Sequence, residues 1–451
     1  MMKRRILSVA ALLLAASLSA FAQEIVKTGI NLGPLPLVAY DADKGMQYGA
    51  TLAINDFGDG SSYPNYKSKL FFELSFFSKG SKLAQIRYDN KVLIPNVRWS
   101  STLRVNLDNA ADFYGFNGYE SYFDWSKVAD GKAGRSFQFT PFYRYRRNDV
   151  LFKSDFIGRI NDALSWEAGI FANYIGTGSI DYDNINKNKS DDQKYPSTLP
   201  TLFSIYKDAG IISSEDANGG FASGVRGGMV YDTRDKEGAP SKGIWTEAHF
   251  AAALPLISKT PYLKYSITHR QYIPIVGNDV LTFAYRLNYE GTIGKAPFYS
   301  LGYLTVMGER SDIEGMGGFN TIRGLMMRRV VGLDMADYNA ELRWRFSKFT
   351  LWKQNIALGL NLFSDGAMVT RKFDIDETAL SALQATSPAK IISGVKESMH
   401  MTVGAGFRFI MNENFIVAAD YGMPLMHLCK NSVNYDQDGT GALYVNLGYL
   451  F

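Results

Sequence analysis

Polar and apolar residues alternate with a period of two along several segments of this chain, at 69–76, 136–146, 281–290 and 337–346. Because successive side chains of a β-strand point to opposite faces, this alternation predicts strands with one apolar and one charged face. Segment 337–346 shows the pattern most clearly. Its polar face holds Asp337, Asn339, Glu341, Arg343 and Arg345, and its apolar face holds Tyr338, Ala340, Leu342, Trp344 and Phe346.

The length of these runs distinguishes two kinds of β-protein. Each run has about the 9–11 residues that a tilted membrane strand needs, whereas strands of soluble sandwiches are commonly nearer five or six residues. A closed barrel satisfies its backbone hydrogen bonds at membrane depth. We therefore expect an all-β fold, a transmembrane antiparallel β-barrel with its charged face in the lumen and its apolar face towards lipid. A soluble β-protein, whose strands also alternate, is the alternative.

The pattern predicts about sixteen strands, an even number that puts both chain ends on the periplasmic side and long loops outside. Four long connections, 177–218, 292–333, 366–398 and 423–440, follow odd-numbered strands as this requires, but 107–133 falls on the periplasmic side. The expected strands are 45–57, 67–77, 81–90, 97–106, 134–147, 150–160, 163–176, 219–233, 242–254, 261–274, 279–291, 334–347, 354–365, 399–410, 414–422 and 441–451.

The first 22 residues have the three parts of a secretory signal peptide: basic residues 3–5, an apolar stretch 6–20 and a small-x-small cleavage site at 20–22. An uncleaved membrane anchor is the alternative, although the stretch is short for a span of about 20 apolar residues. The predicted organisation is a signal peptide at 1–22, a short periplasmic segment at 23–44 and the barrel at 45–451.

Composition narrows the class of protein further. Of 451 residues, 46% are hydrophobic and one is a cysteine, which excludes disorder, a disulfide scaffold and a Cys-ligated metal domain. The formal charge of +4 comes mostly from the leader, because removing its three basic residues leaves 48 − 3 = 45 basic against 44 acidic groups. This balance gives no sign of a nucleic-acid partner. After the leader, no window reaches the 18 consecutive apolar residues of a membrane helix.

Residues for catalysis or metal binding are scarce. The four histidines, at 249, 269, 400 and 427, form no His-Glu-x-x-His motif, and no Gly-x-Ser-x-Gly motif occurs. The acidic stretch 181–192 does not fit an EF-hand, because Ile185 holds its fifth position and no glycine follows at the sixth. We therefore expect neither an enzyme, a cofactor nor a metal site. A short surface helix is expected within 374–388.

The last ten residues alternate up to the end of the given sequence. Leu443, Val445, Leu447, Tyr449 and Phe451 fall on one face of the expected last strand. An alternating strand with a terminal aromatic resembles the signal by which outer-membrane barrels are recognised for insertion. We therefore expect Tyr449 and Phe451 to serve as an insertion signal for the barrel's own assembly machinery.

A glycine-rich motif lies in the long connection before strand 334–347. Residues 317–325 read Gly-Gly-Phe-Asn-Thr-Ile-Arg-Gly-Leu, which resembles the Val/Ile-Arg-Gly-Phe/Tyr loop tip of the BamA/TamA-type barrel superfamily, the bacterial surface antigen family. Leu325 departs from the usual aromatic. Other stretches match this family in order: Phe113–Gly118, the Asp232, Arg234, Asp235 and Gly243 strand-turn motif, Glu341-Leu342, Phe363–Gly366, Gly404–Arg408 and Asp420–Leu425.

The resemblance implies a loop folded back into the barrel. In the family, the arginine of this tip meets acidic lumen residues, so Arg323, beside Gly324, would reach Glu341 and Asp365, which both point into the lumen by alternation. A guanidinium–carboxylate contact in a partly dry pore is strong and geometrically specific. The other possibility is an exposed Arg323, with the carboxylates paired to Arg343, Arg345 or Arg408 instead.

The resemblance also implies a function in the outer membrane of a Gram-negative-type bacterium. Family members insert or translocate proteins, and BamA-like members carry periplasmic POTRA domains before the barrel. The 22 residues from 23 to 44 are too few for such a domain, so a separate periplasmic or outer-membrane protein would supply that part. The expected surroundings are outer-membrane lipid. A passive pore or channel and a structural surface barrel are the alternatives.

Overall fold

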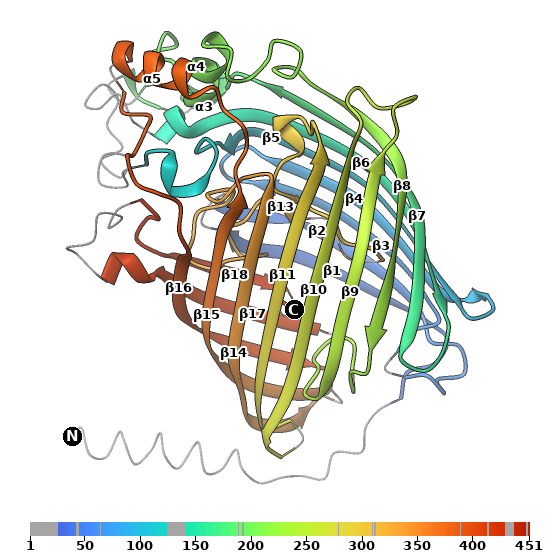
Figure 1. Cartoon of the computed structure of the whole chain (residues 1–451). Coiled ribbons are helices and arrows are strands. Elements are labelled where there is room, and N and C mark those ends of the chain that lie inside the picture. The colour runs from blue at the N-terminus through green and yellow to red at the C-terminus, as the bar shows by residue number, and fades with distance from the viewer. Residues whose placement is uncertain are drawn as a thin grey trace, which may run out of the picture.

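The computed structural model shows a closed antiparallel barrel of sixteen strands (Figure 1). It describes residues 26–451, apart from 42–44, 64, 124–139, 188, 192–193, 278, 309, 311–312, 353, 388, 413–414, 429–436 and 448–449. The predicted fold class is confirmed. The barrel strands are β1 (Ile30–Asp41), β2 (Gly45–Asp56), β3 (Ser68–Phe77), β4 (Lys82–Ile94), β5 (Val97–Asp112), β6 (Arg144–Arg159), β7 (Leu164–Gly178), β8 (Gly219–Asp232), β9 (Gly243–Ala253), β10 (Tyr262–Val276), β11 (Leu281–Gly294), β14 (Asp334–Leu351), β15 (Gln354–Arg371), β16 (His400–Met411), β17 (Phe415–Pro424) and β18 (Ala442–Leu447).

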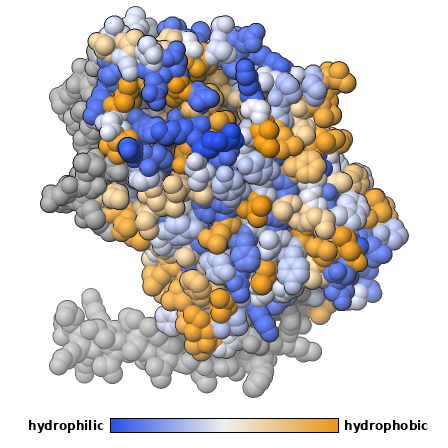
Figure 2. All heavy atoms as spheres, viewed as in Figure 1, coloured by the Kyte–Doolittle hydropathy of each residue, from blue (hydrophilic) through white to orange (hydrophobic). Residues whose placement is uncertain are grey.

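The alternation separates the lumen from the outer surface as predicted. Along β14, Glu341 and Arg343 are buried, whereas Trp344 between Arg343 and Arg345 is 48% exposed. Along β11, Arg286 is buried and Leu287 is exposed. Figure 2 shows many orange, hydrophobic residues on the flanks of the barrel, and blue and orange residues mixed at its loop end. This apolar outer surface is the one that lipid covers.

The first barrel strand lies earlier than the sequence predicted. Residues 30–41 form β1, which pairs with β2 over twelve residue pairs, so the expected start of the barrel at residue 45 is wrong. Pro34 and Pro36 made this stretch resemble a linker. A proline has no N–H for a ladder, so both nitrogens must face away from β2, towards the last strand. The predicted signal peptide, 1–22, lies outside the described residues.

The predicted strands 134–147 and 150–160 are also wrong as a pair, because one strand, β6, runs from Arg144 to Arg159. The two polar residues left between them, Asn148 and Asp149, looked like a turn. With β1 added and these two strands merged, every long connection follows an odd-numbered barrel strand. The described parts of the connection after β5, 113–123 and 140–143, therefore lie at the outer end with the others, which removes the conflict at 107–133.

The end of the chain departs from the expected last strand. β18 ends at Leu447, and Phe451 is buried beside Tyr272 of β10, with ring centres 6.3 Å apart. Arg343 donates to the main-chain oxygen of Phe451 at 2.8 Å. Phe451 thus packs inside the barrel and not on its lipid face, so the expected geometry of the insertion signal is wrong at this residue. Tyr449 lies outside the described residues.

The outer connections pack together at one end of the barrel, where Figure 1 shows the helices. These are α3 (Tyr182–Asn186), α4 (Leu202–Asp208) and α5 (Glu377–Thr386). α5 confirms the helix expected within 374–388, and Asp376 caps it by accepting from Thr378 and Ala379. Among the described residues, no helix is long and apolar enough to cross a membrane.

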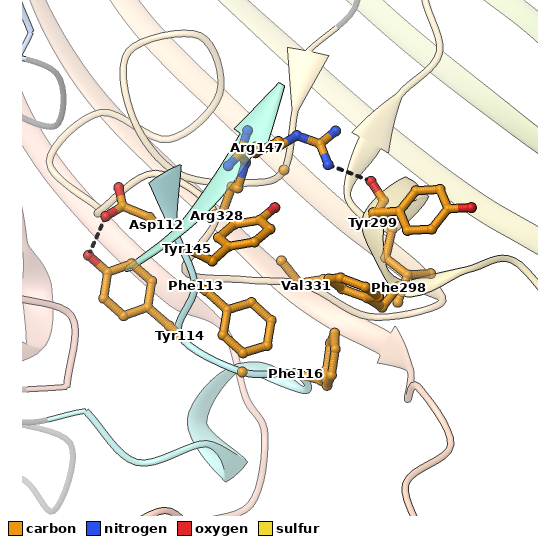
Figure 3. Close-up of a pocket in the computed structure, with 13 residues that line it drawn as sticks. Asp112, Phe113, Tyr114, Phe116, Tyr145, Arg147, Phe298, Tyr299, Arg328 and Val331 are labelled. Carbon is orange, nitrogen blue, oxygen red and sulfur yellow. Dashed lines mark hydrogen bonds between the residues drawn. The ribbon is translucent and has the colours of Figure 1, made fainter. Parts of the chain in front are cut away.

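An aromatic cluster holds these connections over the barrel mouth. Figure 3 shows Phe113 and Phe116, which follow β5, facing Phe298 from the connection after β11; the ring centres lie 6.4 and 6.5 Å from that of Phe298. Arg147 of β6 donates to the main-chain oxygen of Tyr299 at 2.7 Å. The cavity left between them is about 30 Å³, room for roughly one water molecule. These packed side chains therefore cover part of the outer mouth.

Candidate functional site

The connection between β11 and β14, residues 295–333, enters the lumen and folds into a tight tip at 317–325. Thr321 Oγ1 accepts from the Gly317 N–H at 2.8 Å and donates to the Gly317 oxygen at 2.9 Å. Gly317 has a φ of 125°, and a Cβ there would lie 1.8 Å from the Met326 oxygen. The glycine is therefore required by the turn. Asn339 of β14 donates to the Thr321 oxygen at 2.7 Å, which ties the tip to the wall.

Arg323 lies at this tip and is fully buried. Its Nε and Nη2 donate to the two carboxylate oxygens of Asp365, at 2.9 and 3.0 Å. Its Nη1 lies 2.6 Å from Glu341 Oε1, the separation of a close ion pair, although the angle is not that of a hydrogen bond. The guanidinium also lies 3.6 Å from the centre of the Phe363 ring. One planar group makes all these contacts at once, which a lysine cannot.

Two more arginines and one more carboxylate complete the cluster. Arg343 donates to Glu341 at 2.6 Å. Arg408 donates to both oxygens of Asp420, at 2.7 and 2.8 Å, and Asp420 lies 3.5 Å from Arg323. Three guanidinium groups therefore face three carboxylates, Glu341, Asp365 and Asp420. Each buried charge has an opposite partner, which offsets part of the cost of removing the groups from water.

The structure thus brings the predicted Arg323, Glu341 and Asp365 together. The alternative of an exposed Arg323 is wrong, because this residue is fully buried. Of the three arginines considered as other partners of the carboxylates, Arg343 and Arg408 lie in the same cluster, whereas Arg345 pairs with Asp279. The sequence did not predict that Asp420 joins them. This residue alternates with Ala418 on the lumen side of β17, and its parity is the signal that could have identified it.

The residues after Arg323 pack against the last two strands. Gly324 has a φ of 90°, and a Cβ there would lie 2.4 Å from the Gly422 carbonyl carbon of β17. Leu325, which departs from the aromatic of the resembled motif, is fully buried in a cluster with Ile322 and Val369. Tyr444 of β18 donates to the Leu325 oxygen at 3.4 Å. The loop tip therefore contacts the strands that close the barrel.

An earlier part of the same connection, residues 305–310, is attached to the opposite wall. Its main-chain groups bind side chains of β6, β8, β9 and β11, and Arg310 also pairs with Glu247 of β9. These contacts hold the connection across the lumen at two places. The main-chain partners are Lys153 and Arg226 at the Val306 oxygen, His249 at the Thr305 oxygen, Glu290 at the Thr305 N–H and Asp155 at the Gly308 N–H.

The predicted strand-turn motif shapes the connection between β8 and β9. Asp235 accepts from the Ser241 N–H at 2.9 Å, the Ser241 hydroxyl at 2.6 Å and the Lys242 N–H at 3.2 Å. Arg234 donates to Asp232 at 2.9 and 2.7 Å. Gly243 has a φ of 109°, and a Cβ there would lie 2.3 Å from the Thr233 oxygen. Each motif residue therefore stabilises the turn 233–242.

This turn should loosen in acid. Burial tends to raise the pKa of the Asp235 carboxyl, but hydrogen bonds from Ser241 and Lys242 outweigh it and hold the pKa below its ordinary value of 3.8. Stability from a lowered pKa is present above that ordinary value and is lost as the pH falls through the folded one. We expect hydrogen exchange of 233–242, corrected for intrinsic rates, to quicken below about pH 4. In the Asp235→Ala variant, hydrogen exchange of 233–242 should be fast already at pH 7. Equal protection of this turn in the native protein and the variant would contradict the role of Asp235.

Comparison with known proteins identifies the family. The sequence model described as the Omp85 superfamily domain matches residues 99–451. The chain belongs to the Omp85 superfamily. The resemblance to BamA/TamA-type barrels is thereby confirmed, and the protein is an outer-membrane β-barrel of a Gram-negative-type bacterium. The matched region contains Arg323, Glu341, Asp365 and the turn motif.

Solved structures of Omp85 type resemble this barrel. BamA from Haemophilus ducreyi lacking POTRA domains 1–3 has a TM-score of 0.53 and 13% identity, covering 94% of this chain and 70% of that chain. CdiB from Escherichia coli has a TM-score of 0.53 and 10% identity, covering 95% of this chain and 64% of that chain. The chain thus spans less than two thirds of CdiB. At these identities the likeness concerns the fold. A comparison with curated protein sequences finds no match.

Proposed function

We propose that this Omp85 barrel inserts other proteins into the outer membrane or moves them across it, through the seam between β1 and β18. The observation that carries the proposal is the weakness of that seam. Among the described residues, the β1–β18 ladder holds one pair, Tyr40 opposite Val445, compared with six pairs between β17 and β18 and twelve between β1 and β2. Over the described residues, separating β1 from β18 therefore breaks fewer backbone hydrogen bonds than separating β17 from β18 or β1 from β2.

The prolines of β1 limit the hydrogen bonds that its seam edge can form. In the register of Tyr40 opposite Val445, Leu447 falls opposite Val38, and Pro36 and Pro34 lie further along β1. Their nitrogens face that side and have no hydrogen to donate. A cavity of about 150 Å³ occupies this part of the seam, between Leu35–Ala39 of β1 and Phe415 and Val417 of β17.

The lumen loop links the seam to the barrel wall. Its tip contacts β17 through Asp420 and Gly422 and β18 through Tyr444. We infer that the pinned loop holds these strands in place while β1 separates from them. We further propose that a separate periplasmic protein receives the clients. The loop also crosses the lumen and is attached to both walls, which favours this role over a passive pore.

Depletion of this protein tests the proposed function. We expect a selective loss of other barrels or surface proteins from the outer membrane, measured by quantitative proteomics against an undepleted control. The lost set would name the clients. An unchanged outer-membrane proteome would contradict the proposed function. Steady conductance in planar bilayers would then support the alternative of a passive pore.

Locking β1 to β18 with a disulfide should have the same effect on the outer membrane as depletion of the protein. In a Cys429→Ser background, Tyr40→Cys and Val445→Cys place two thiols directly opposite, within disulfide reach. Oxidation should abolish complementation of the depleted strain, and reduction should restore it. The control pair, Tyr421→Cys and Leu443→Cys, joins β17 to β18 and should be harmless when oxidised. Full activity of the locked β1–β18 barrel would contradict a role for the seam.

A further inference from the structure

The turn 233–242 reaches both sides of the periplasmic mouth. On one side, Glu237 pairs with Lys91 of β4 at 2.9 Å and with Arg98 of β5 at 3.4 Å. On the other side, Arg345 of β14 donates to the Ala239 oxygen at 3.0 Å. Ala239 is buried in a cluster with lumen-facing residues of three further strands, Ala357 of β15, Ile410 of β16 and Ile416 of β17.

The strand order shows how far this turn extends. β8 and β9 are adjacent, yet the turn between them contacts β4 in one direction and β17 in the other. These contacts lie at the ends of the strands opposite the long outer loops. A turn that only joined two neighbouring strands would need none of them. We propose that 233–242 is a lid that closes the periplasmic mouth of the barrel and can open.

The contacts of the lid indicate that opening is easier than releasing the lumen loop. The turn keeps its own shape through Asp235 and Arg234, as described above, so it can move as a unit beyond the last β8–β9 pair, Asp232 opposite Trp245. The Glu237 side chain is 47% exposed, although its partners Lys91 and Arg98 are only 19% and 26% exposed, and an ion pair that water reaches is weaker than a fully buried one. By contrast, Arg323 is fully buried among its carboxylates.

Trp245 provides a contact between the lid and the lumen loop. Arg234 of the turn lies 3.7 Å from the centre of the indole, and Arg310 of the lumen loop lies 4.5 Å from the same ring. Arg270 of β10 adds a third contact at 3.9 Å. Stacking of guanidinium groups on one indole is attractive for each of them. Movement of the lid therefore changes the surroundings of an anchor of the loop.

Thiol labelling of the full-length barrel in proteoliposomes tests the lid. Ala357→Cys, in a Cys429→Ser background, places one thiol beneath Ala239. A membrane-impermeant maleimide applied to the periplasmic face should label it slowly. Adding Glu237→Ala should speed labelling about fivefold or more, the effect of losing weak surface ion pairs on an open–closed ratio. This readout does not depend on protein insertion, so it can fail or succeed independently of the proposed function.

Two controls make the outcome decisive. Trp352→Cys, at the exposed β14–β15 turn, is 86% exposed as the native tryptophan and should label equally fast with and without Glu237→Ala. Asp59→Ala removes another exposed ion pair, with Lys67 at 3.0 Å, and should leave labelling of the Ala357→Cys thiol unchanged. The proposal of a lid is wrong if Glu237→Ala does not alter the labelling rate of the Ala357→Cys thiol, or if Asp59→Ala increases that rate equally.

Discussion

Replacing Arg323 with alanine should destabilise the barrel by about 3–5 kcal/mol, the usual cost of removing one partner from a buried ion pair. The reason is the charge balance of the lumen cluster. Without this guanidinium, Glu341, Asp365 and Asp420 would face two arginines, and Asp365 would lose both of its side-chain hydrogen bonds from Arg323. The loss of stability is measured as a lower urea midpoint of unfolding. The folded barrel is detected by its faster migration on unheated gels.

Arg323→Lys distinguishes geometry from charge. Lysine keeps the positive charge, but it cannot donate to both oxygens of Asp365 while contacting Glu341, so its stability should fall between those of the native protein and Arg323→Ala. The matched control is Arg159→Ala. Arg159 pairs with Asp162 on the surface, where the two side chains are 57% and 100% exposed, and such a pair contributes little. Equal urea midpoints for Arg323→Ala and Arg159→Ala would show that the loop is not pinned by this residue.

Gly324→Ala should also be strongly destabilising, by about 2–5 kcal/mol. The φ of 90° at Gly324 is strained for any residue with a Cβ, which costs about 1–2 kcal/mol. The added methyl would also lie 2.4 Å from the backbone of Gly422, and such overpacking costs about 1–3 kcal/mol more. Gly422→Ala approaches the same contact from the other side, since its Cβ would lie 2.5 Å from the Arg323 oxygen, and should weaken the barrel similarly.

Gly394 offers the control for this pair. It has a similar φ of 77°, yet nothing lies within 4 Å of an added Cβ. Gly394→Ala therefore carries the backbone strain of about 1–2 kcal/mol without the collision. The urea midpoints of the three variants measure the difference directly. If Gly324→Ala and Gly394→Ala lose the same stability, the close approach of the loop tip to β17 is not required.

Local sequence pattern was sufficient wherever one strand face meets lipid and the other meets the lumen. The alternation at 337–346 identified β14 and the side of each residue, because the period of a strand is two whatever its neighbours are. It failed where local composition opposed the tertiary structure. Pro34 and Pro36 made β1 resemble a linker. The barrel tolerates these prolines in β1 only because this strand borders the seam. Asn148 and Asp149 divided β6 in the prediction, although a barrel lumen accepts a charged residue such as Asp149, which is buried there beside Arg104.

The sequence by itself determined the class of fold, the lumen side of Glu341 and Asp365, and the motifs of the Omp85 superfamily. Only the tertiary structure decided which charges meet. Asp420 joins Arg323 because β15, β16 and β17 are neighbours in the barrel, and Ala239 reaches Ala357 because a turn crosses the mouth. Alternation along one strand predicts the direction of each side chain, but it does not predict which residues of other strands lie close to it. Closure of the barrel supplies those distances, and with them the pinned loop, the weak seam and the lid.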